Sequence, residues 1–266
     1  GECACEPGYG SDDCSASGEH SITQLATDSD GRAIVLDFAP ATRRFAVHAI
    51  HAAVDGTGAV ECAGADAKPM CSGTWPIVLD ANYAAWTRPF LFASLGAGTV
   101  LQYEPAHGAY LLLGCDGNCE GGVPCSRRIT SGRCTDMQLP LGPSMRASYL
   151  GEDTVLFHNG ATGAYTVHRL APGFEHWDAG CMFDPPLASG SWGETGVHRY
   201  TWMGVGDLLI DYEPARGNYS IWTLNRAAQA NEDPRSAIQT VGHLMATSKS
   251  FVGLGDGLLM LASTTS

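Results

Sequence analysis

The segments IVLDFAPATRRFAVHAI (34–50), TVLQYEPAHGAYLLLGC (99–115), TVLFHNGATGAYTVHRL (154–170) and LLIDYEPARGNYSIWTL (208–224) align with one another without a gap. A fifth segment, LLMLASTTS (258–266), begins in the same way and is truncated. Successive copies start 50 to 65 residues apart, a spacing typical of blade-type β repeats that carry insertions. This internal repeat decides the fold class.

Each full copy has the pattern of a strand, a turn and a second strand. An apolar run precedes the turn, and the second run begins with an aromatic residue. Within the turn, three copies carry a proline and three a glycine: Pro40, Pro105, Pro214, Gly108, Gly163 and Gly217. A fixed φ is thus followed by a residue that tolerates positive φ, which is typical of hairpins.

Further strands are expected on both sides of each hairpin. The upstream candidates are SITQLATDSDG, FLFASLGAG, MRASYLGED, YTWMGVGD and SFVGLGDG, and weaker downstream candidates start at Gly73, Asp136, Ser189 and Ser236. Four strands per copy make a propeller blade. We therefore predict an all-β fold, a β-propeller of about five blades with four full repeats and a truncated fifth. A β-sandwich or irregular barrel is the alternative.

The charge balance argues against nucleic acid and membrane as partners. The net charge is -13, and lysine occurs only at Lys68 and Lys249. Such a surface repels a phosphate backbone, whose binding rests on clustered cations. No segment approaches the roughly 20 apolar residues of a membrane-spanning helix. We expect a folded, secreted protein.

The ten cysteines predict disulfides in an oxidising compartment. Cys62 and Cys71 flank one polar insertion and are placed to close it. Four more cysteines lie in a glycine-rich insertion, and their gaps do not match the paired spacing of zinc sites; they are Cys115, Cys119, Cys125 and Cys134.

The first 14 residues resemble part of a known module. Cys3-Ala4-Cys5-Glu6-Pro7-Gly8-Tyr9, followed by Cys14, resembles the C-terminal half of an EGF-like module. The resemblance implies a bond between Cys5 and Cys14, and it divides the chain into an EGF-like remnant (1–18) and a propeller (19–266). Cys3 and Cys181 are then left over, either bonded together or free.

The repeat unit also resembles a family of secreted lectins. The segment YEPARGNYSIW (212–222) is similar in general form to the aromatic strand-turn-strand unit of tectonin-type and tachylectin-type propellers. That resemblance implies sugar binding at loops between blades.

No catalytic motif of nucleophile, zinc or phosphate chemistry occurs in the chain. Aromatic rings and nearby polar groups suit sugar binding. The ligand-binding residues that we predict are Trp86, Trp177, Trp192, Trp202 and Tyr149. The leading prediction is a non-enzymatic, extracellular, glycan-binding protein.

Two other functions and one metal site stay open. One function is an adhesive subunit that binds an extracellular protein or a second copy through its incomplete last blade. The other is a polysaccharide hydrolase or lyase on a propeller scaffold. No cofactor is predicted, although Asp28 and Asp30 weakly resemble a calcium loop.

Overall fold

A computed structural model shows two compact units, unit 1 (mainly Gly1–Arg133) and unit 2 (Cys134–Phe174 and Gly180–Thr265). Each is described by itself. The described residues are 3–4, 21–27, 29–30, 32–39, 42–54, 60–63, 69–75, 91–96, 98–104, 108–115, 119, 124–125, 127–134, 139, 145–160, 162–173, 181–193, 198–203, 207–213, 215–225, 233–244, 249–255 and 258–263. Among them, no helix is long and apolar enough to cross a membrane. The predicted boundary between residues 18 and 19 lies outside these ranges.

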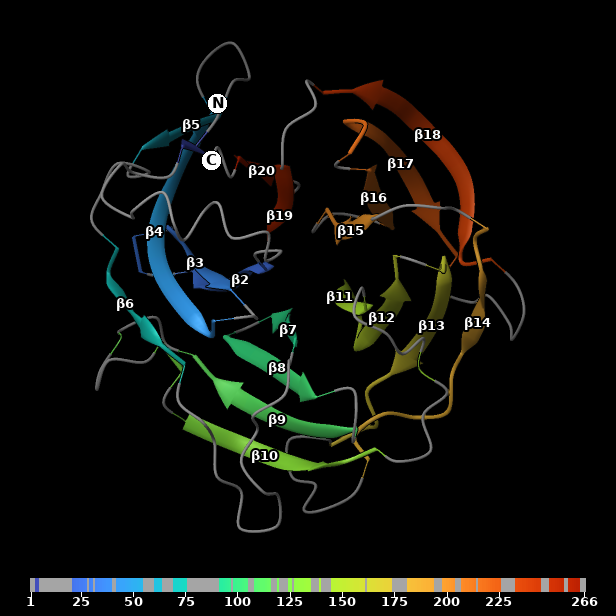
Figure 1. Ribbon diagram of the computed structural model, residues 1–266, viewed down its shortest axis with the longest axis horizontal. Helices are drawn as coiled ribbons and strands as arrows, with labels where there is room; N and C mark the ends of the chain where they lie inside the picture. Colours follow the sequence, from blue (N-terminus) through green and yellow to red (C-terminus); the bar gives the residue numbers. More distant parts are fainter. Residues whose placement is uncertain are drawn as a thin grey trace. The chain divides into compact units, whose positions relative to one another are not determined.

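Unit 1 contains two antiparallel sheets. One has the order β2-β3-β4-β5, with β6 also paired to β4, and the other has the order β10-β9-β8-β7 (Figure 1). The strands of this unit are β1 (Cys3–Ala4), β2 (Ser21–Thr27), β3 (Ala33–Ala39), β4 (Arg44–Val54), β5 (Val60–Ala63), β6 (Cys71–Thr74), β7 (Leu91–Gly96), β8 (Thr99–Glu104), β9 (Ala109–Gly114) and β10 (Arg127–Arg133).

Unit 2 contains sheets of the order β11-β12-β13-β14 and β15-β16-β17-β18, and the antiparallel pair β19 and β20. Its strands are β11 (Met145–Gly151), β12 (Thr154–Asn159), β13 (Ala164–Arg169), β14 (Ala188–Ser191), β15 (Arg199–Trp202), β16 (Leu208–Glu213), β17 (Asn218–Leu224), β18 (Arg235–His243), β19 (Lys249–Gly255) and β20 (Leu258–Ser263).

Each sheet of four or more strands is a meander that covers one sequence repeat, as propeller blades are. Within a unit, the first strands of successive blades contact each other: β2 contacts β7, β11 contacts β15, and β15 contacts β19. The all-β propeller prediction is therefore confirmed. The predicted count of about five blades is wrong, because the described residues form four blades, and in the truncated copy they form the hairpin of β19 and β20.

The strand predictions hold except in the second copy. The upstream segments form β2, β7, β11, β15 and β19. The fourth strand of the second blade is β10, not the segment expected at Asp136, which lies outside the described residues. Hydrogen bonding to β9 makes a strand of the polar sequence RRITSGR, although its composition resembles a loop.

The hairpin turn explains the recurrent glycine. Gly163 and Gly217 have φ values of 67° and 71°, and their amides donate to Asn159 and Glu213 carbonyls at 2.9 and 2.8 Å. In the first copy Arg43 holds this place with φ 59° and donates to the Ala39 carbonyl at 2.8 Å. A side chain is strained in this left-handed region.

A second regularity couples the outer two strands of every blade. The aromatic residue that opens the third strand lies opposite a glycine of the fourth strand. The register pairs are Phe45 with Gly73, Tyr110 with Gly132, Tyr165 with Gly190, and Tyr219 with Gly242. The ring covers the strand where a side chain is missing, so the two positions depend on each other.

Three disulfides occur among the described residues. Cys71 bonds Cys119 and Cys115 bonds Cys125 in unit 1, and Cys134 bonds Cys181 in unit 2. The prediction that Cys62 and Cys71 close one insertion is therefore wrong, because Cys71 bonds Cys119. The pairing prediction failed because the fold brings two insertions together across 48 residues of sequence.

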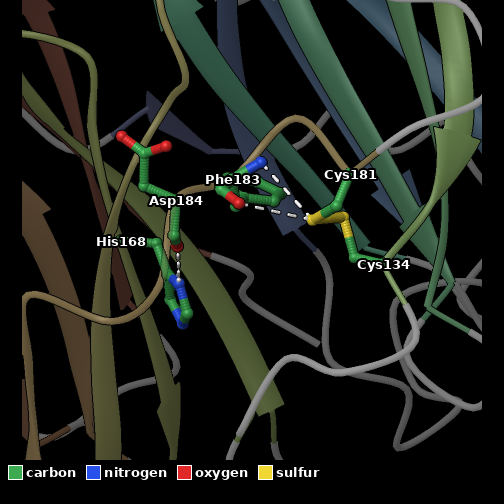
Figure 2. Close-up of a disulfide and its surroundings, with 5 residues drawn as sticks. All are labelled: Cys134, His168, Cys181, Phe183 and Asp184. Atoms are coloured by element: carbon green, nitrogen blue, oxygen red, sulfur yellow. Dashed lines mark hydrogen bonds between the residues drawn. A yellow bond between two sulfur atoms is a disulfide. The ribbon is translucent and has the colours of Figure 1, made fainter.

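Cys181 is not left over, since it closes a loop of unit 2 with Cys134. Figure 2 shows the Phe183 amide donating to the Cys181 sulfur at 3.4 Å, and His168 Nδ1 donating to the Asp184 carbonyl at 3.0 Å. Disulfides of this kind indicate an oxidising environment. The predicted pair Cys5 and Cys14, and the rest of the EGF-like segment beyond Cys3–Ala4, lie outside the described residues.

Candidate functional site

Two of the predicted ligand-binding aromatics meet in unit 2. Tyr149 on β11 and Trp202 on β15 are half-buried, and their ring centroids lie 6.2 Å apart with the ring planes at 85°. The Asp153 amide donates to the Tyr149 hydroxyl oxygen at 3.2 Å. Trp86 and Trp177 lie outside the described residues.

The strand register places Tyr149 and Trp202 at one repeat position. Tyr149 pairs with Val155 and Trp202 with Leu209, the second residue of their repeats. The other copies have small or polar residues there: Gln24 opposite Val35, Ser94 opposite Val100, and Gly253 opposite Leu259. A blade therefore forms without an aromatic ring at this position. The two rings of unit 2 need another explanation than blade folding.

Three residues before each of these rings stands an arginine. Arg146 lies opposite His158, and Arg199 lies opposite Tyr212. The strands that carry them are joined, because the Ser148 hydroxyl donates to the Tyr200 carbonyl at 2.7 Å. The sequence analysis did not single out either arginine: Arg146 lies within the candidate strand MRASYLGED, and Arg199 directly precedes the candidate strand YTWMGVGD.

Trp192, the third predicted aromatic, belongs to a packed group that we call the interblade cluster: His158, Tyr165, Trp192, His198, Tyr200, Asp211, Asp233 and Arg235. The Trp192 ring stacks on Tyr165 with centroids 4.3 Å apart and planes at 18°. The Arg235 guanidinium lies 4.3 Å from the centre of the Trp192 ring. Two groups so close must cover opposite faces of the ring.

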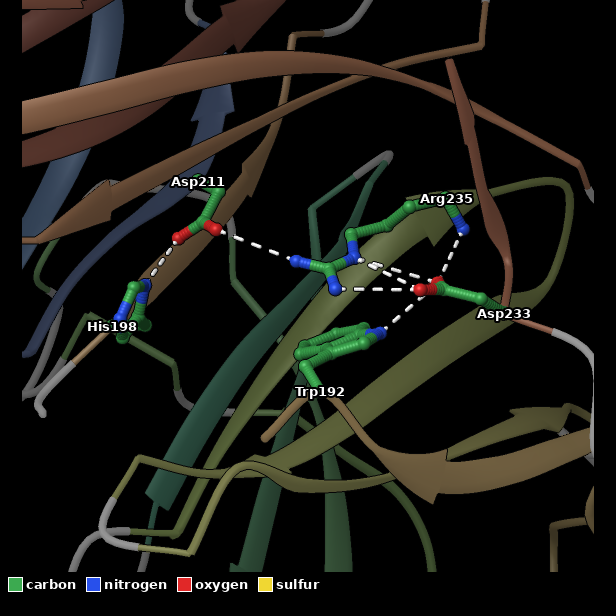
Figure 3. Close-up of polar contacts among 5 residues, drawn as sticks. All are labelled: Trp192, His198, Asp211, Asp233 and Arg235. Atoms are coloured by element: carbon green, nitrogen blue, oxygen red, sulfur yellow. Dashed lines mark hydrogen bonds and ion pairs between the residues drawn. The ribbon is translucent and has the colours of Figure 1, made fainter. Parts of the chain in front are cut away.

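Five members of the cluster, Trp192, His198, Asp211, Asp233 and Arg235, are paired with one another, as Figure 3 shows. The Trp192 Nε1 donates to Asp233 at 3.0 Å, and Arg235 forms ion pairs with Asp233 at 3.3 Å and with Asp211 at 3.7 Å. His198 Nδ1 donates to the other Asp211 oxygen at 2.8 Å. The carboxylate of Asp211 is thus held between an imidazole and a guanidinium.

Unit 1 contains an apolar counterpart of this cluster. Trp75 stands where Trp192 stands in its repeat, and it contacts Phe45 and Phe92 with centroids 5.5 and 4.7 Å apart. Phe38 occupies the position of His158 and lies 4.7 Å from Phe92. Apolar rings therefore suffice to pack two neighbouring blades. Unit 2 has titratable groups at the matching positions.

His158 is the most unusual of these groups. It is 2% exposed, its ring lies against Tyr200 and Trp192, and neither ring nitrogen has a hydrogen-bond partner among the described residues. Burial, with the nearby charges of His198, Arg235 and Arg146, lowers the pKa of His158 to about 3. The imidazole is neutral at physiological pH.

The calcium site remains a prediction. Asp30 is exposed and pairs with Arg32 at 3.3 Å, whereas Asp28 lies outside the described residues. Within the described ranges, no three metal-ligating side chains form a group.

No protein-family model and no curated protein matches the chain. Solved structures similar to it include the WD40 domain of Toxoplasma gondii coronin, with 10% identity, a TM-score of 0.42, and coverage of 82% of this chain and 58% of that chain. Myxococcus xanthus glutaminyl cyclase has 10% identity and a TM-score of 0.44, with 91% and 89% covered.

Pseudomonas aeruginosa periplasmic gluconolactonase has 12% identity and a TM-score of 0.39, with 92% of this chain and 58% of that chain covered. The chain thus spans little more than half the length of the coronin and gluconolactonase structures. At these identities the activities belong to those proteins alone. The class of this protein follows from its own sheets: it is an all-β protein of the propeller type.

Proposed function

We propose that the protein is a secreted glycan-binding protein that holds sugar rings against Tyr149 and Trp202. The observation that carries the proposal is the repeat position of the two rings. Where other copies have Gln24, Ser94 and Gly253, these two neighbouring blades have half-buried aromatic residues in edge-to-face contact.

The chemistry of the pair suits a sugar. An aromatic ring offers a flat apolar surface to the C–H face of a sugar ring, while nearby polar groups bond its hydroxyls. Two rings at 85° present surfaces in two directions, so they can contact adjoining residues of an oligosaccharide. The disulfides are consistent with export into an oxidising environment.

A glycan array followed by fluorescence titration tests this function. The informative variants are Tyr149→Ser and Trp202→Gln, which introduce residues that the chain itself carries at the same repeat position in Ser94 and Gln24. Both variants should fold and lose glycan binding by at least about tenfold. Ile238→Ser, which changes an exposed apolar residue on β18, is the matched control and should bind as the wild type does.

An adhesive subunit is the second candidate, and one observation favours it. Ile238 and Val241 are 53% and 66% exposed on β18, the last strand of its sheet. Exposed apolar residues on an edge strand favour association with another chain. Sedimentation of the wild type and of Val241→Ser over a range of concentrations tests this candidate: a concentration-dependent dimer that the variant abolishes would support it, and a monomer throughout would refute it.

A further inference from the structure

We propose that Asn218 is an N-glycosylation site, and that its glycan covers exposed apolar residues of strand β18. The segment Asn218-Tyr219-Ser220 has the N-x-S pattern that this modification requires. The inference goes beyond the proposed function: it depends on export of the chain, and not on what Tyr149 and Trp202 bind.

The propeller fold does not require this sequon. Asn218 and Ser220 are the eleventh and thirteenth residues of their repeat. The other three full copies have arginine or alanine at the first of these positions, and alanine, leucine or threonine at the second. No other asparagine of the sequence begins an N-x-S or N-x-T pattern. Blades therefore form without these two residues, and the sequon is a feature of the fourth copy alone.

Asn218 is accessible to a glycan. It is exposed, and it directly follows the tight turn in which the Gly217 amide donates to the Glu213 carbonyl at 2.8 Å. The turn residues Ala215 and Arg216 are exposed as well. An oligosaccharide is bulky and needs a surface position of this kind. A glycan on Asn218 can thus extend from the hairpin without displacing packed residues.

The strand register places exposed apolar residues on the same face of the sheet as Asn218. Ser220 and Trp222 share that face, because alternate residues of the regular strand β17 point to one side. Val241 pairs with Ser220, and Ile238 pairs with Trp222. Val241 and Ile238 are 66% and 53% exposed, and they are two of only three large apolar side chains that are exposed in the described part of the chain. An apolar row therefore begins beside Asn218.

A bulge in β18 brings Val241 and Ile238 to this common face. They are three residues apart, so strict alternation would place them on opposite faces. The register of β17 and β18 shifts at Gln239, and its side chain donates to the Thr223 hydroxyl at 2.6 Å on the other face of the sheet. The extra residue of the bulge thus restores both apolar side chains to one side.

Strand β18 lacks the protection that the other outer strands have. Edge strands avoid pairing with other chains when they are short or charged. Strands β5, β6 and β14 have four residues each, and β10 contains three arginines. Strand β18 has nine residues, and its segment 236–242 contains no aspartate, glutamate, lysine or arginine. A glycan on the same face would supply the missing protection.

The spacing of the residues suits this contact. His243 lies directly opposite Asn218, so Val241 is a diagonal neighbour of Asn218 on the same face, at roughly 7–8 Å between Cα atoms. The first sugar residues of a glycan on Asn218 can therefore lie over Val241, with their C–H faces in apolar contact. A glycosylated chain then cannot associate through β18 as the adhesive candidate requires.

Expression with an export signal in a eukaryotic host, followed by glycopeptide mass spectrometry, tests the modification. Asn218→Gln and Ser220→Ala each destroy the sequon, whereas Ser220→Thr keeps it and is the matched control. Peptide N-glycosidase removes the sugar from the wild type without a mutation. Sedimentation over a range of concentrations then measures whether each form associates.

We expect a glycan on Asn218 in the wild type and in Ser220→Thr, and both should be monomeric. Asn218→Gln, Ser220→Ala and the enzymatically deglycosylated wild type should form dimers at the same concentrations, and the further change Val241→Ser should abolish them. An exported wild type without a glycan on Asn218 would overturn the inference, and so would deglycosylated forms that stay monomeric. Neither result bears on sugar binding by Tyr149 and Trp202, which is measured separately on the unmodified chain.

Discussion

Gly190 lies directly opposite Tyr165 across strands β13 and β14, so close that a Cβ atom on Gly190 would be 2.8 Å from the Tyr165 hydroxyl oxygen. The same ring stacks on Trp192, with the ring centroids 4.3 Å apart. The glycine therefore sets the position of Tyr165, and Tyr165 sets the position of the tryptophan that packs the two blades of unit 2.

Gly190→Ala should destabilise the protein by about 1–3 kcal/mol, because the added methyl group must displace a packed ring. Urea unfolding monitored by tryptophan fluorescence measures the change. Ser189→Ala, one residue earlier on β14, should change the stability by less than about 0.5 kcal/mol. Equal stabilities of the two variants would contradict the role assigned to the glycine.

The turn position predicts a pair of opposite effects. Arg43 has φ 59° where Gly163 has φ 67°. Arg43→Gly should therefore stabilise the protein by about 1 kcal/mol, and Gly163→Ala should destabilise it by about 1–2 kcal/mol. Thermal unfolding of both variants checks the two signs. A loss of stability in Arg43→Gly would contradict the prediction, because it would show that the Arg43 side chain stabilises the fold by more than its left-handed backbone destabilises it.

Arg235 should contribute strongly to the stability of unit 2. Its side chain is 7% exposed, it pairs with Asp211 and Asp233, and its guanidinium lies 4.6 Å from the Trp222 ring centre as well. Arg235→Met keeps the packing volume but removes the guanidinium that pairs with the buried Asp211 carboxylate, which keeps its hydrogen bond from His198. We therefore expect a loss of about 3 kcal/mol in the free energy of unfolding.

The control is Arg216→Met, which removes an exposed ion pair with Glu213. An exposed pair is worth at most about 1 kcal/mol. Chemical denaturation of both variants gives the comparison, and a similar loss in each would mean that burial of Arg235 adds nothing.

His158 predicts a particular dependence of stability on pH. Its pKa is about 3 in the folded chain and near 6.5 in an unfolded one. Between these values the unfolded state takes up a proton that the folded state does not, so stability is present above pH 6.5 and is lost as the pH falls toward 3.

His158→Phe introduces the residue found at the same repeat position in Phe38. It should reduce the loss of stability that occurs as the pH falls. Urea unfolding at pH 7, 5.5 and 4.5 measures the effect, and the advantage of the variant over the wild type should grow at each step. The control is His243→Gln, at an exposed histidine of β18, which should lose stability between pH 7 and 4.5 as the wild type does. Parallel curves for the wild type and His158→Phe would contradict the prediction.

The disulfides should contribute according to the loops that they close. The bonds Cys134–Cys181 and Cys115–Cys125 close loops of 47 and 10 residues, for which the chain-entropy model gives about 4 and about 3 kcal/mol. Double serine variants of each pair, compared by urea unfolding, should therefore differ in that order. The opposite order would mean that native-state packing, not chain entropy, determines the loss.

The blades could be predicted from the sequence because the repeat carries its own turn and packing signals. The glycine at positions 108, 163 and 217 and the aromatic residue at the start of each third strand recur in register. Strand β10 could not be predicted, since its sequence RRITSGR has no alternating apolar pattern. The bond between Cys71 and Cys119 depends on where two insertions fold, which their local sequences do not determine.

The candidate site was predicted only in part. Aromatic character identified Trp202 and Tyr149, but not that the two rings share a repeat position. Tyr149 lies five residues before its hairpin segment and Trp202 six before its own, and the strand pairing is what places both opposite the second residue of that segment. The same difference of one residue hides the correspondence of Arg146 and Arg199 in an ungapped comparison of the strands that precede each hairpin.

The proposed function depends most directly on whether Tyr149 and Trp202 bind sugar. Titration of the wild type, Tyr149→Ser and Trp202→Gln with the strongest glycan from an array, read by intrinsic fluorescence, measures this. We expect saturable binding by the wild type and a loss of affinity of at least about tenfold in each variant, with unchanged melting temperatures. Full-strength glycan binding by both folded variants, or no glycan bound by the wild type, would contradict it.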